Sequence, residues 1–263
     1  MSRAQIARIA IFGGGAAGAE IARAALEAGL AVALLEEDAG AAERAAHYLR
    51  RALPARHAAN LTVGTDLGAA NGFDLAIEAS RAPAPALAKL VAALAAQSAQ
   101  GLIAAQVMRD TADLPALAAA LPDPARLCGL AIAAPAHLRR LIEIIPAPQT
   151  APETVAAIED FAAALGKIAI TPARGPLVPT LAARLYHAAD TLLLDGSTPW
   201  EIDEAMEAYG LSPPPYEAQD LSGLDAALSA RRGADLPGAR EIPILSRMVQ
   251  EGRLGAQAGV GWY

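Results

Sequence analysis

The stretch FGGGAAGAEIA, Phe12–Ala22, decides the fold of this chain. The apolar run IARIAIF (Ile6–Phe12) leads into it and is typical of a buried strand. The segment AAGAEIARAALEAG (Ala16–Gly29) follows with the pattern of a helix, and LAVALLEE (Leu30–Glu37) is typical of a second strand. The stretch therefore predicts the glycine turn of a strand–helix–strand unit.

The glycines of this turn have G-x-G-x-x-G spacing, which fits a dinucleotide site. Gly13 permits a tight turn, Gly15 lets the backbone approach a pyrophosphate, and Gly18 lets the helix pack close to the strand. The N–H groups that begin the helix can then bind phosphate. Glu36, 23 positions after Gly13, can bind both ribose hydroxyls and would repel a 2′-phosphate, so the pattern favours NAD over NADP. FAD shares this fingerprint and stays an alternative, as does a turn that serves packing alone. The predicted contacts are Gly13, Gly15, Ala16, Ala17, Gly18 and Glu36.

Further apolar runs alternate with alanine-rich helical segments up to about Pro172, and helical segments alone follow. Alternation of this kind predicts a mostly parallel sheet covered on both faces. We therefore expect an α/β fold, a Rossmann-like doubly wound sheet over residues 1–175, followed by a smaller all-helical domain over residues 176–263. The other predicted strands are Asp74–Ser80, Gly101–Val107, Arg126–Ile132, Leu141–Ile145 and Lys167–Pro172, and the predicted helices of the second domain include Thr180–Leu194 and Pro199–Gly210.

Composition argues against several classes of function. The formal net charge is −7, which disfavours binding to nucleic acid. No uninterrupted apolar stretch is long enough to span a membrane, and the first residues lead straight into a strand rather than a signal peptide. The only cysteine, Cys128, lies in an apolar strand, which indicates a buried thiol and a reducing, cytoplasmic setting. The four histidines are far apart in sequence, so we expect no metal site.

Several longer segments resemble the 3-hydroxyacyl-CoA dehydrogenase family, including the dehydrogenase part of multifunctional β-oxidation enzymes. DLAIEAS is similar to that family's D-x-V-I-E-A segment, and LRRLIEII to its M-K-L-V-E-V-I. WEIDEAMEAYGLSPPPYEAQDLSGLD resembles E-D-I-D-x-A-M…G-P-F-E-L-x-D-x-x-G-L-D, and MVQEGRLGAQAGVGWY resembles M-V-x-x-G-R-L-G-x-K-T-G-x-G-F/W-Y. The resemblance covers nearly the whole chain. It implies an acyl-CoA substrate, a homodimer, and a cofactor site lined by Glu78 and Ala79.

In that family a histidine accepts the proton of the substrate's 3-hydroxyl while hydride passes to NAD, and a glutamate twelve residues later orients it. By the resemblance, Glu143 takes the place of the glutamate, and the histidine's place is occupied by Ala131. The family's strand H-F-F-N-P becomes Ala131-Ile132-Ala133-Ala134-Pro135, so its asparagine is also replaced.

Other family positions differ as well. An ungapped match puts Asp110 at the serine that contacts the substrate oxygen, Pro179 at a second asparagine, and Ala82 at a second glutamate. Asp110 is a candidate base if burial near Glu143 raises its pKa, although a helix-cap role is equally compatible with its position. His137, in the expected turn, and His187, on the long helix, are weaker candidates.

Two hypotheses follow. The first is an NAD-dependent oxidoreductase that interconverts 3-hydroxyacyl-CoA and 3-ketoacyl-CoA, or acts on a related 3-hydroxy substrate, with Glu143 and Asp110 as catalytic residues. The second is an impaired or inactive homologue that binds NAD(H) or acyl-CoA as a sensor or assembly partner. The cofactor turn favours the first hypothesis, and the replaced site residues favour the second.

Overall fold

The computed structural model describes residues 6–80, 84–98, 101–106, 113–132, 136, 139–173, 175–232 and 243–263. The chain divides into two compact units, Met1–Pro176 and Leu177–Tyr263. Asp110, Thr111, His137, Ala134 and Ala82 lie outside the described residues, so the predictions made for them remain predictions.

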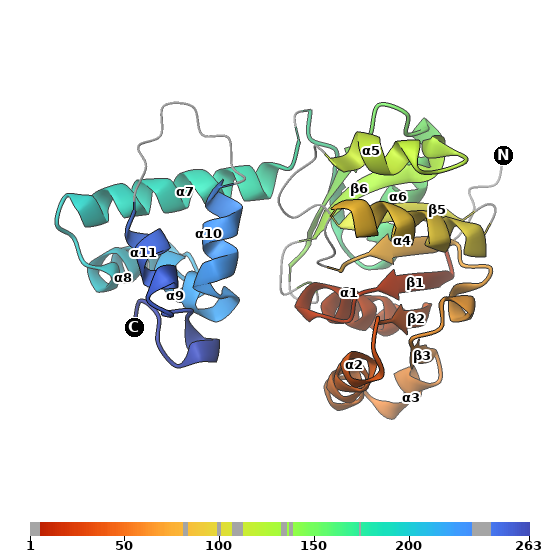
Figure 1. The fold of residues 1–263 in the computed structure, drawn as a ribbon, viewed down its shortest axis with the longest axis horizontal. Helices are drawn as coiled ribbons and strands as arrows, with labels where there is room; N and C mark the ends of the chain where they lie inside the picture. Colours follow the sequence, from red (N-terminus) through yellow and green to blue (C-terminus); the bar gives the residue numbers. More distant parts are fainter. Residues whose placement is uncertain are drawn as a thin grey trace. The chain divides into compact units, whose positions relative to one another are not determined.

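The first unit is built on one twisted sheet (Figure 1). In the described residues its strands follow the order β3-β2-β1-β4-β5-β6-β7-β8. The first six of these are parallel, β7 is antiparallel to β6, and β8 is parallel to β7. The predicted doubly wound, mostly parallel sheet is therefore confirmed. The strands are β1 Arg8–Phe12, β2 Ala31–Leu35, β3 Leu61–Gly64, β4 Leu75–Glu78, β5 Leu102–Gln106, β6 Leu127–Ile132, β7 Leu141–Pro146 and β8 Ile168–Ile170.

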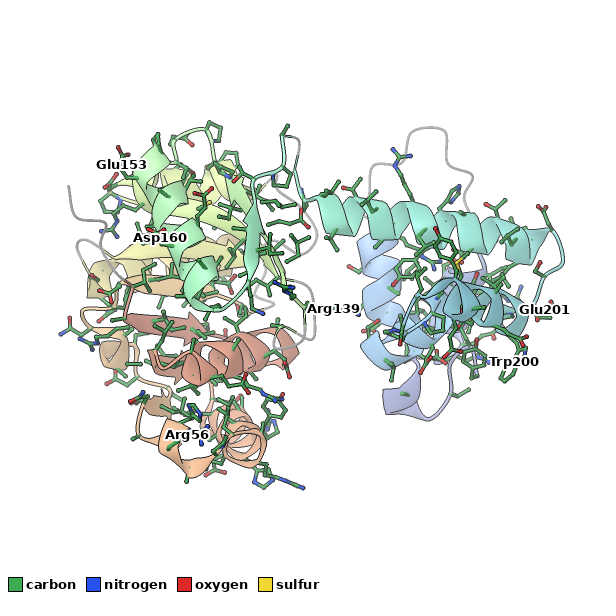
Figure 2. The ribbon with its side chains drawn as sticks, turned by 180° about the vertical axis from the view of Figure 1, so that it is seen from behind. Arg56, Arg139, Glu153, Asp160, Trp200 and Glu201 are labelled. Atoms are coloured by element: carbon green, nitrogen blue, oxygen red, sulfur yellow. The ribbon has the colours of Figure 1, made fainter. Side chains whose placement is uncertain are left out.

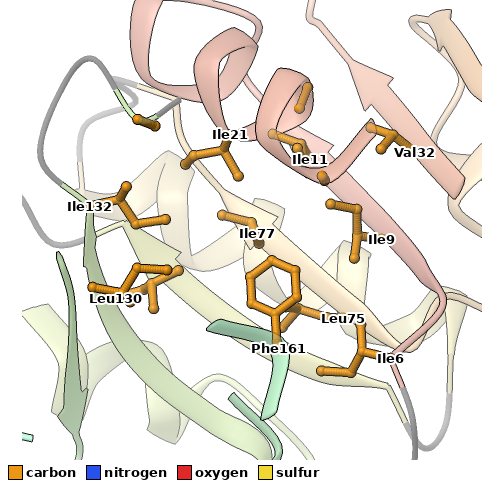
Figure 3. Close-up of a cluster of buried hydrophobic side chains, with 14 of the residues drawn as sticks. Ile6, Ile9, Ile11, Ile21, Val32, Leu75, Ile77, Leu130, Ile132 and Phe161 are labelled. Atoms are coloured by element: carbon orange, nitrogen blue, oxygen red, sulfur yellow. The ribbon is translucent and has the colours of Figure 1, made fainter. Parts of the chain in front are cut away.

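Helices cover both faces of this sheet and bury two apolar clusters. One cluster joins β1, β4, β6 and β7 to α1, α2 and α6, and Leu49 is fully buried in it. Ile21 and Phe161 are almost fully buried in the same cluster (Figure 3). The other cluster lies under α4 and α5 and contains Phe12, Leu94 and Leu117. The helices of this unit are α1 Ala16–Glu27, α2 Ala39–Ala52, α3 Ala55–Ala58, α4 Ala84–Gln97, α5 Asp113–Ala119 and α6 Pro152–Ala164, with short 3₁₀ turns η1 Leu67–Ala70 and η2 Pro124–Arg126. Glu153 and Asp160 project from the outer side of α6 (Figure 2).

The second unit is all-helical in its described residues, as the sequence predicts. Helix α8 has complete end signals: Thr198 and Glu201 form a capping box, and Gly210 ends the helix at φ +107°. The helices are α7 Leu177–Leu194, α8 Pro199–Tyr209, α9 Pro215–Ser222, α10 Leu224–Arg232 and α11 Ile244–Gln250, followed by the 3₁₀ turn η3 Ala256–Ala258.

Two elements differ from the sequence predictions. Strand β3 was not predicted, because LTVG is short and only half-buried at the edge of the sheet. Helix α7 begins at Leu177, three residues before the predicted start at Thr180. Pro179 therefore lies within its first turn, where a missing N–H removes no hydrogen bond of the helix. The other strand ends differ from prediction by only a few residues.

Candidate functional site

Three loops meet at the carboxyl edge of β1, β2 and β4. The register pairs Phe12 with Leu35 on one side and with Glu78 on the other, so the residues that follow these strands become neighbours. Gly13 N–H donates to the Leu35 carbonyl at 2.8 Å, and Ala79 N–H donates to the Phe12 carbonyl at 2.8 Å. The sheet thus brings the glycine turn, the tip of β2 and the end of β4 into one place.

The glycine turn has no room for side chains at two positions and open space at a third. Gly13 has φ +99°, and a Cβ there would lie 2.6 Å from the Ser80 nitrogen. A Cβ on Gly18 would lie 1.7 Å from the Gly13 carbonyl oxygen. A Cβ on Gly15 would meet no atom within 4 Å. Gly13 and Gly18 are therefore required by the fold, whereas Gly15 borders space that a ligand can enter.

Helix α1 begins directly at this open space. Its N-cap is Gly15, which offers no side-chain cap, and its first turn contains no acidic residue. The N–H groups of Ala16, Ala17 and Gly18 have no partner four residues back within the helix. This helix end therefore presents donors and a partial positive charge, which suit a pyrophosphate.

Glu36 lies at the tip of β2, beside the turn. Its Oε1 accepts a hydrogen bond from Gly14 N–H at 2.5 Å. Ala45 of α2 closes the other side of Gly14, since a Cβ on that glycine would lie 2.7 Å from the Ala45 Cβ. The acid is thus held against the glycine turn, where an acidic residue in this kind of fold can bind the ribose hydroxyls of a dinucleotide.

The Glu78 side chain is hydrogen-bonded within the loop that follows β4. The residue is buried, and its Oε1 accepts a hydrogen bond from Ser80 N–H at 2.6 Å. Burial raises the pKa of this carboxyl above its ordinary value, while the hydrogen bonds from Ser80 oppose the shift. Glu78 therefore shapes the Ala79–Ser80 bend that packs on Gly13, so its part in the site is to support the turn.

Ala131 and Glu143 are direct partners in the antiparallel pair β6–β7. Their exposed fractions are 5% and 1%. Directly opposed residues place their side chains on the same face, with Cβ atoms about 4.5–5.5 Å apart. Because β1, β4, β5 and β6 are parallel neighbours, this pair lies near the same carboxyl edge as the glycine turn, about three strand spacings of about 4.8 Å away.

Two further residues singled out in the sequence, His187 and Cys128, lie on α7 and β6. His187 is half-buried on α7, where its backbone carbonyl accepts a hydrogen bond from the Thr191 hydroxyl. Cys128 is fully buried in β6, and burial raises the pKa of its thiol to about 12. No group of three metal-ligating side chains gathers among the described residues. No helix in the described part of the chain is long and apolar enough to cross a membrane.

The long C-terminal sequence signatures build a buried polar frame in the second unit. Asp203 accepts hydrogen bonds from the N–H groups of Tyr216 and Glu217, at 2.9 and 2.8 Å, and from the Tyr263 hydroxyl at 2.8 Å. Asp220 accepts from the N–H groups of Trp262 and Tyr263. These two aspartates therefore join α8, α9 and the last residues of the chain. This role was not predicted from the sequence. The signal available for it was that Asp203 and Asp220 both fall within the segment WEIDEAMEAYGLSPPPYEAQDLSGLD.

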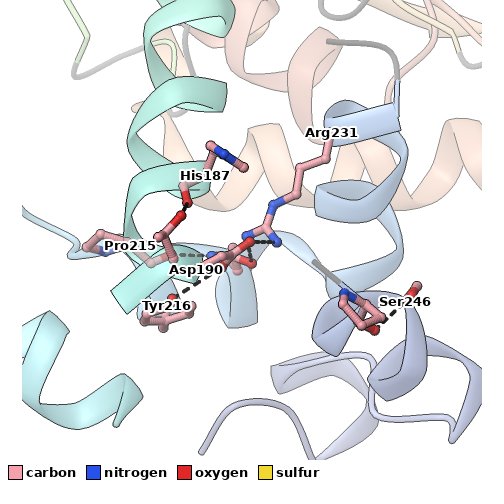
Figure 4. Close-up of polar contacts among 9 residues, drawn as sticks. His187, Asp190, Pro215, Tyr216, Arg231 and Ser246 are labelled. Atoms are coloured by element: carbon pink, nitrogen blue, oxygen red, sulfur yellow. Dashed lines mark hydrogen bonds and ion pairs between the residues drawn. The ribbon is translucent and has the colours of Figure 1, made fainter. Parts of the chain in front are cut away.

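A second buried group connects α7 to α10 (Figure 4). Arg231 forms an ion pair with Asp190 and donates to the Gln219 side chain at 2.8 Å. Asp190 also accepts from the Tyr216 hydroxyl at 3.2 Å. Arg231 and Asp190 thus neutralise each other inside this unit, which is typical of a structural network.

The chain matches two models of known protein domains, one after the other. Residues 8–174 match the NAD-binding domain of 3-hydroxyacyl-CoA dehydrogenase, and residues 175–263 match its C-terminal domain.

Individual relatives show the same likeness. The chain is 31% identical over 167 residues to the peroxisomal bifunctional enzyme of Cavia porcellus, which covers 57% of this chain and 23% of that protein. It is 28% identical over 292 residues to the human mitochondrial hydroxyacyl-coenzyme A dehydrogenase, covering 98% of this chain and 91% of that protein. The structure of (S)-3-hydroxybutyryl-CoA dehydrogenase from Ralstonia eutropha matches with a TM-score of 0.86 at 25% identity, over 98% of this chain and 99% of that one. The chain therefore spans about a quarter of the bifunctional relatives and most of the length of the single-function ones.

Proposed function

Because the chain belongs to the 3-hydroxyacyl-CoA dehydrogenase family, we propose that it interconverts a 3-hydroxyacyl-CoA and the corresponding 3-ketoacyl-CoA, or acts on a related 3-hydroxy substrate. The chain carries the family's NAD-binding domain. The chemistry that bound NAD supplies is the acceptance or return of a hydride. The work left to the protein is to hold the cofactor, place the substrate and move the hydroxyl proton.

The cofactor part of the proposal is supported by the carboxyl edge of β1 and β2. The first-turn N–H groups of Ala16, Ala17 and Gly18 would hold the pyrophosphate, and the open face of Gly15 leaves room for it. Glu36 would exchange its hydrogen bond from Gly14, or share it, with the adenosine ribose hydroxyls. A carboxylate at this position disfavours a 2′-phosphate, which supports NAD rather than NADP.

The single observation that carries the catalytic proposal is the pairing of Ala131 with Glu143. By the resemblance, Ala131 stands at the family's base position, and the register places the Glu143 carboxylate directly across from it. We propose that Glu143 acts on the substrate hydroxyl in place of the imidazole, directly or through one water, with Asp110 as the second candidate. Loss of a positioned base typically costs about 10²–10⁴-fold in rate, so turnover of ordinary substrates should be slow.

The test is the oxidation of NADH with acetoacetyl-CoA, compared between the wild type and Glu143→Gln. We expect slow turnover in the wild type, a further loss in Glu143→Gln, and equal NADH affinity in both proteins. Asp110→Asn is the matched variant for the second candidate. Turnover that survives both substitutions would contradict the assignment of the base, and no turnover with any 3-ketoacyl or 3-hydroxyacyl thioester would contradict the reaction.

The replacement of the histidine also supports a second function, an inactive homologue that binds NAD(H) or acyl-CoA as a sensor or assembly partner. In that case the cofactor edge is kept for binding alone. NADH binding without turnover, unaffected by Glu143→Gln, would support this alternative. Turnover lost in Glu143→Gln would exclude it.

We further propose that the chain forms a homodimer through its second unit. Helix α7 exposes large apolar side chains that its own unit does not cover, namely Leu177, Leu181, Leu192 and Leu194. Leu181 is 55% exposed, so a charge there should not disturb the folded unit. We expect Leu181→Glu to convert a dimer to a monomer in sedimentation equilibrium. A wild type that is already monomeric would contradict this part of the proposal.

The compartment is also a proposal. The only cysteine, Cys128, is buried in β6 and forms no disulfide. A chain without disulfides is compatible with a reducing compartment, and we propose the cytoplasm. Fractionation of the cells that express the chain tests this directly.

A further inference from the structure

Lysine is rare in this chain. Only two of its 21 basic lysine and arginine residues are lysines, Lys89 and Lys167. Lys89 is exposed on α4, whereas Lys167 is half-buried just before β8. A chain that uses arginine almost everywhere else therefore keeps an ammonium group at one partly buried position.

The Lys167 ammonium reaches the connection between β6 and β7. Its Nζ donates to the Ala136 carbonyl and, at 2.8 Å, to the Arg139 carbonyl (Arg139 is labelled in Figure 2). The next residue, Ile168, donates its N–H to the Arg140 carbonyl at 2.7 Å, where β8 starts to pair with β7. The Lys167 side chain, just before β8, and the Ile168 N–H, at its start, thus bind three carbonyls of the same connection.

The chemistry of these contacts explains why the residue is a lysine. The three N–H donors of an ammonium point apart from one nitrogen, so several carbonyls can surround it, whereas a guanidinium presents its donors in a flat fork that suits carboxylates. Hydrogen bonds from a charged donor are roughly twice as strong as neutral ones. Burial lowers the pKa of Lys167, and the charge of Glu27 opposes that shift, so the contacts must offset a real desolvation cost.

The connection held in this way is the one that joins the two candidate catalytic positions. Ala131 lies one residue before the end of β6, and Glu143 lies two residues after the start of β7. Ala136 belongs to the same apolar cluster as Ile132 and Ile142, which flank the pair on the opposite face. A movement of this connection would therefore act on the strand ends that carry Ala131 and Glu143.

We propose that Lys167 is a positioning residue, which ties the β6–β7 connection to β8 and so fixes the Ala131–Glu143 pair for reaction. The effect on catalysis rests on the proposed function. The attachment of the connection by Lys167, here called the tether, rests on its hydrogen bonds alone. It requires no contact between Lys167 and the substrate. It assigns a task to a residue that the cofactor site and the acid–base pair do not use.

The tether is tested first by nuclear magnetic resonance of the whole protein carrying isotope-labelled lysine. We expect the ammonium protons of Lys167 to exchange slowly enough to give a signal at neutral pH, and those of exposed Lys89 to give none. Lys89→Met and Lys167→Met assign the two positions. Absence of a Lys167 ammonium signal would overturn the proposal, and this measurement does not depend on activity.

The positioning role is tested by the kinetics of Lys167→Met, which keeps the length of the side chain and removes its donors. We expect kcat with acetoacetyl-CoA to fall on the order of 10-fold or more, since a 1 Å misplacement costs about 10²-fold. The Kd for NADH should stay unchanged, Lys167→Arg should recover only part of the loss, and Lys89→Met should match the wild type. An unchanged kcat in folded Lys167→Met would overturn the role. A wild type without turnover that still shows the protected ammonium would refute the proposed function and leave the tether in place.

Discussion

Ala131 and Glu143 face each other across β6 and β7, in direct register and almost completely buried. The Ala131 methyl group and the Glu143 carboxylate thus lie side by side near the carboxyl edge of the sheet. The consequence can be measured in both directions, by adding a base and by removing the acid.

The substitution Ala131→His should raise activity. An imidazole at this position comes within reach of Glu143, which can hold the protonated ring, and a positioned base typically contributes about 10²–10⁴-fold. We expect kcat/KM for acetoacetyl-CoA reduction to rise by a factor within that range. Ala131→Gln, of similar bulk but without a titrating group, is the control. Equal gains in both variants would mean that packing, and not proton transfer, is responsible.

Two glycines of the same turn should respond in opposite ways. Gly18→Ala puts a Cβ 1.7 Å from the Gly13 carbonyl oxygen, so we expect a large fall in Tm. Gly15→Ala meets nothing within 4 Å, so Tm should be nearly unchanged while the affinity for NADH falls, because the new methyl group occupies the space beside the helix end. Thermal unfolding and NADH fluorescence titration check both. If Gly15→Ala binds NADH as the wild type does, the pyrophosphate lies elsewhere.

Glu78 should make stability depend on pH. Burial raises the pKa of its carboxyl above the ordinary value of 4.5, so the folded state binds the proton more tightly than the unfolded state. Its contribution to stability is therefore fully present below the unfolded pKa and is lost as pH rises through the folded pKa. Glu78→Gln keeps an acceptor for Ser80 N–H without the charge. We expect the free energy of unfolding in urea to rise for the variant relative to the wild type as the pH goes from 4 to 7. A difference that does not change with pH would contradict this account.

The Tyr263 hydroxyl should contribute to the stability of the second unit. It donates to Asp203 Oδ2 at 2.8 Å, and burial together with Asp203 raises its pKa. Tyr263→Phe removes this donor from a buried carboxylate, which typically costs about 1–3 kcal/mol in the free energy of unfolding. Tyr209→Phe is the matched control, because Tyr209 is 85% exposed. Chemical denaturation of both variants gives the comparison, and equal midpoints would show that the bond to Asp203 contributes nothing.

Strong local patterns made most of the first unit predictable. Ile9, Ile11, Leu75 and Ile77 belong to uninterrupted apolar runs, and such runs bounded by glycine or polar turns indicate parallel strands buried on both faces. The edge strand β3 has no such run. Its residues LTVG are half-buried or exposed, and pairing with β2 decides its structure. The start of α7 was predicted too late, after Pro179. A proline is tolerated within the first turn of a helix, so it does not mark where the helix begins.

The site could be predicted only where chain order and spatial order agree. The spacing of Gly13, Gly15 and Gly18 places all three in one turn, and the twelve-residue separation of Ala131 and Glu143 matches their pairing. Contacts between distant segments carry no comparable signal. The bond from Gly14 to Glu36 and the reach of Lys167 to Ala136 both depend on the folded sheet.

Strand β7, which runs antiparallel to β6, lies apart from the strands that build the glycine turn. The glycine turn is built by β1, β2 and β4, whereas the proposed acid–base positions lie on the neighbouring strands β6 and β7. Substitutions in β6 and β7 can therefore change the reaction while the nucleotide-binding strands stay the same. If Ala131 holds the place of the family's histidine, as the resemblance implies, one substitution in β6 is enough to restore that residue.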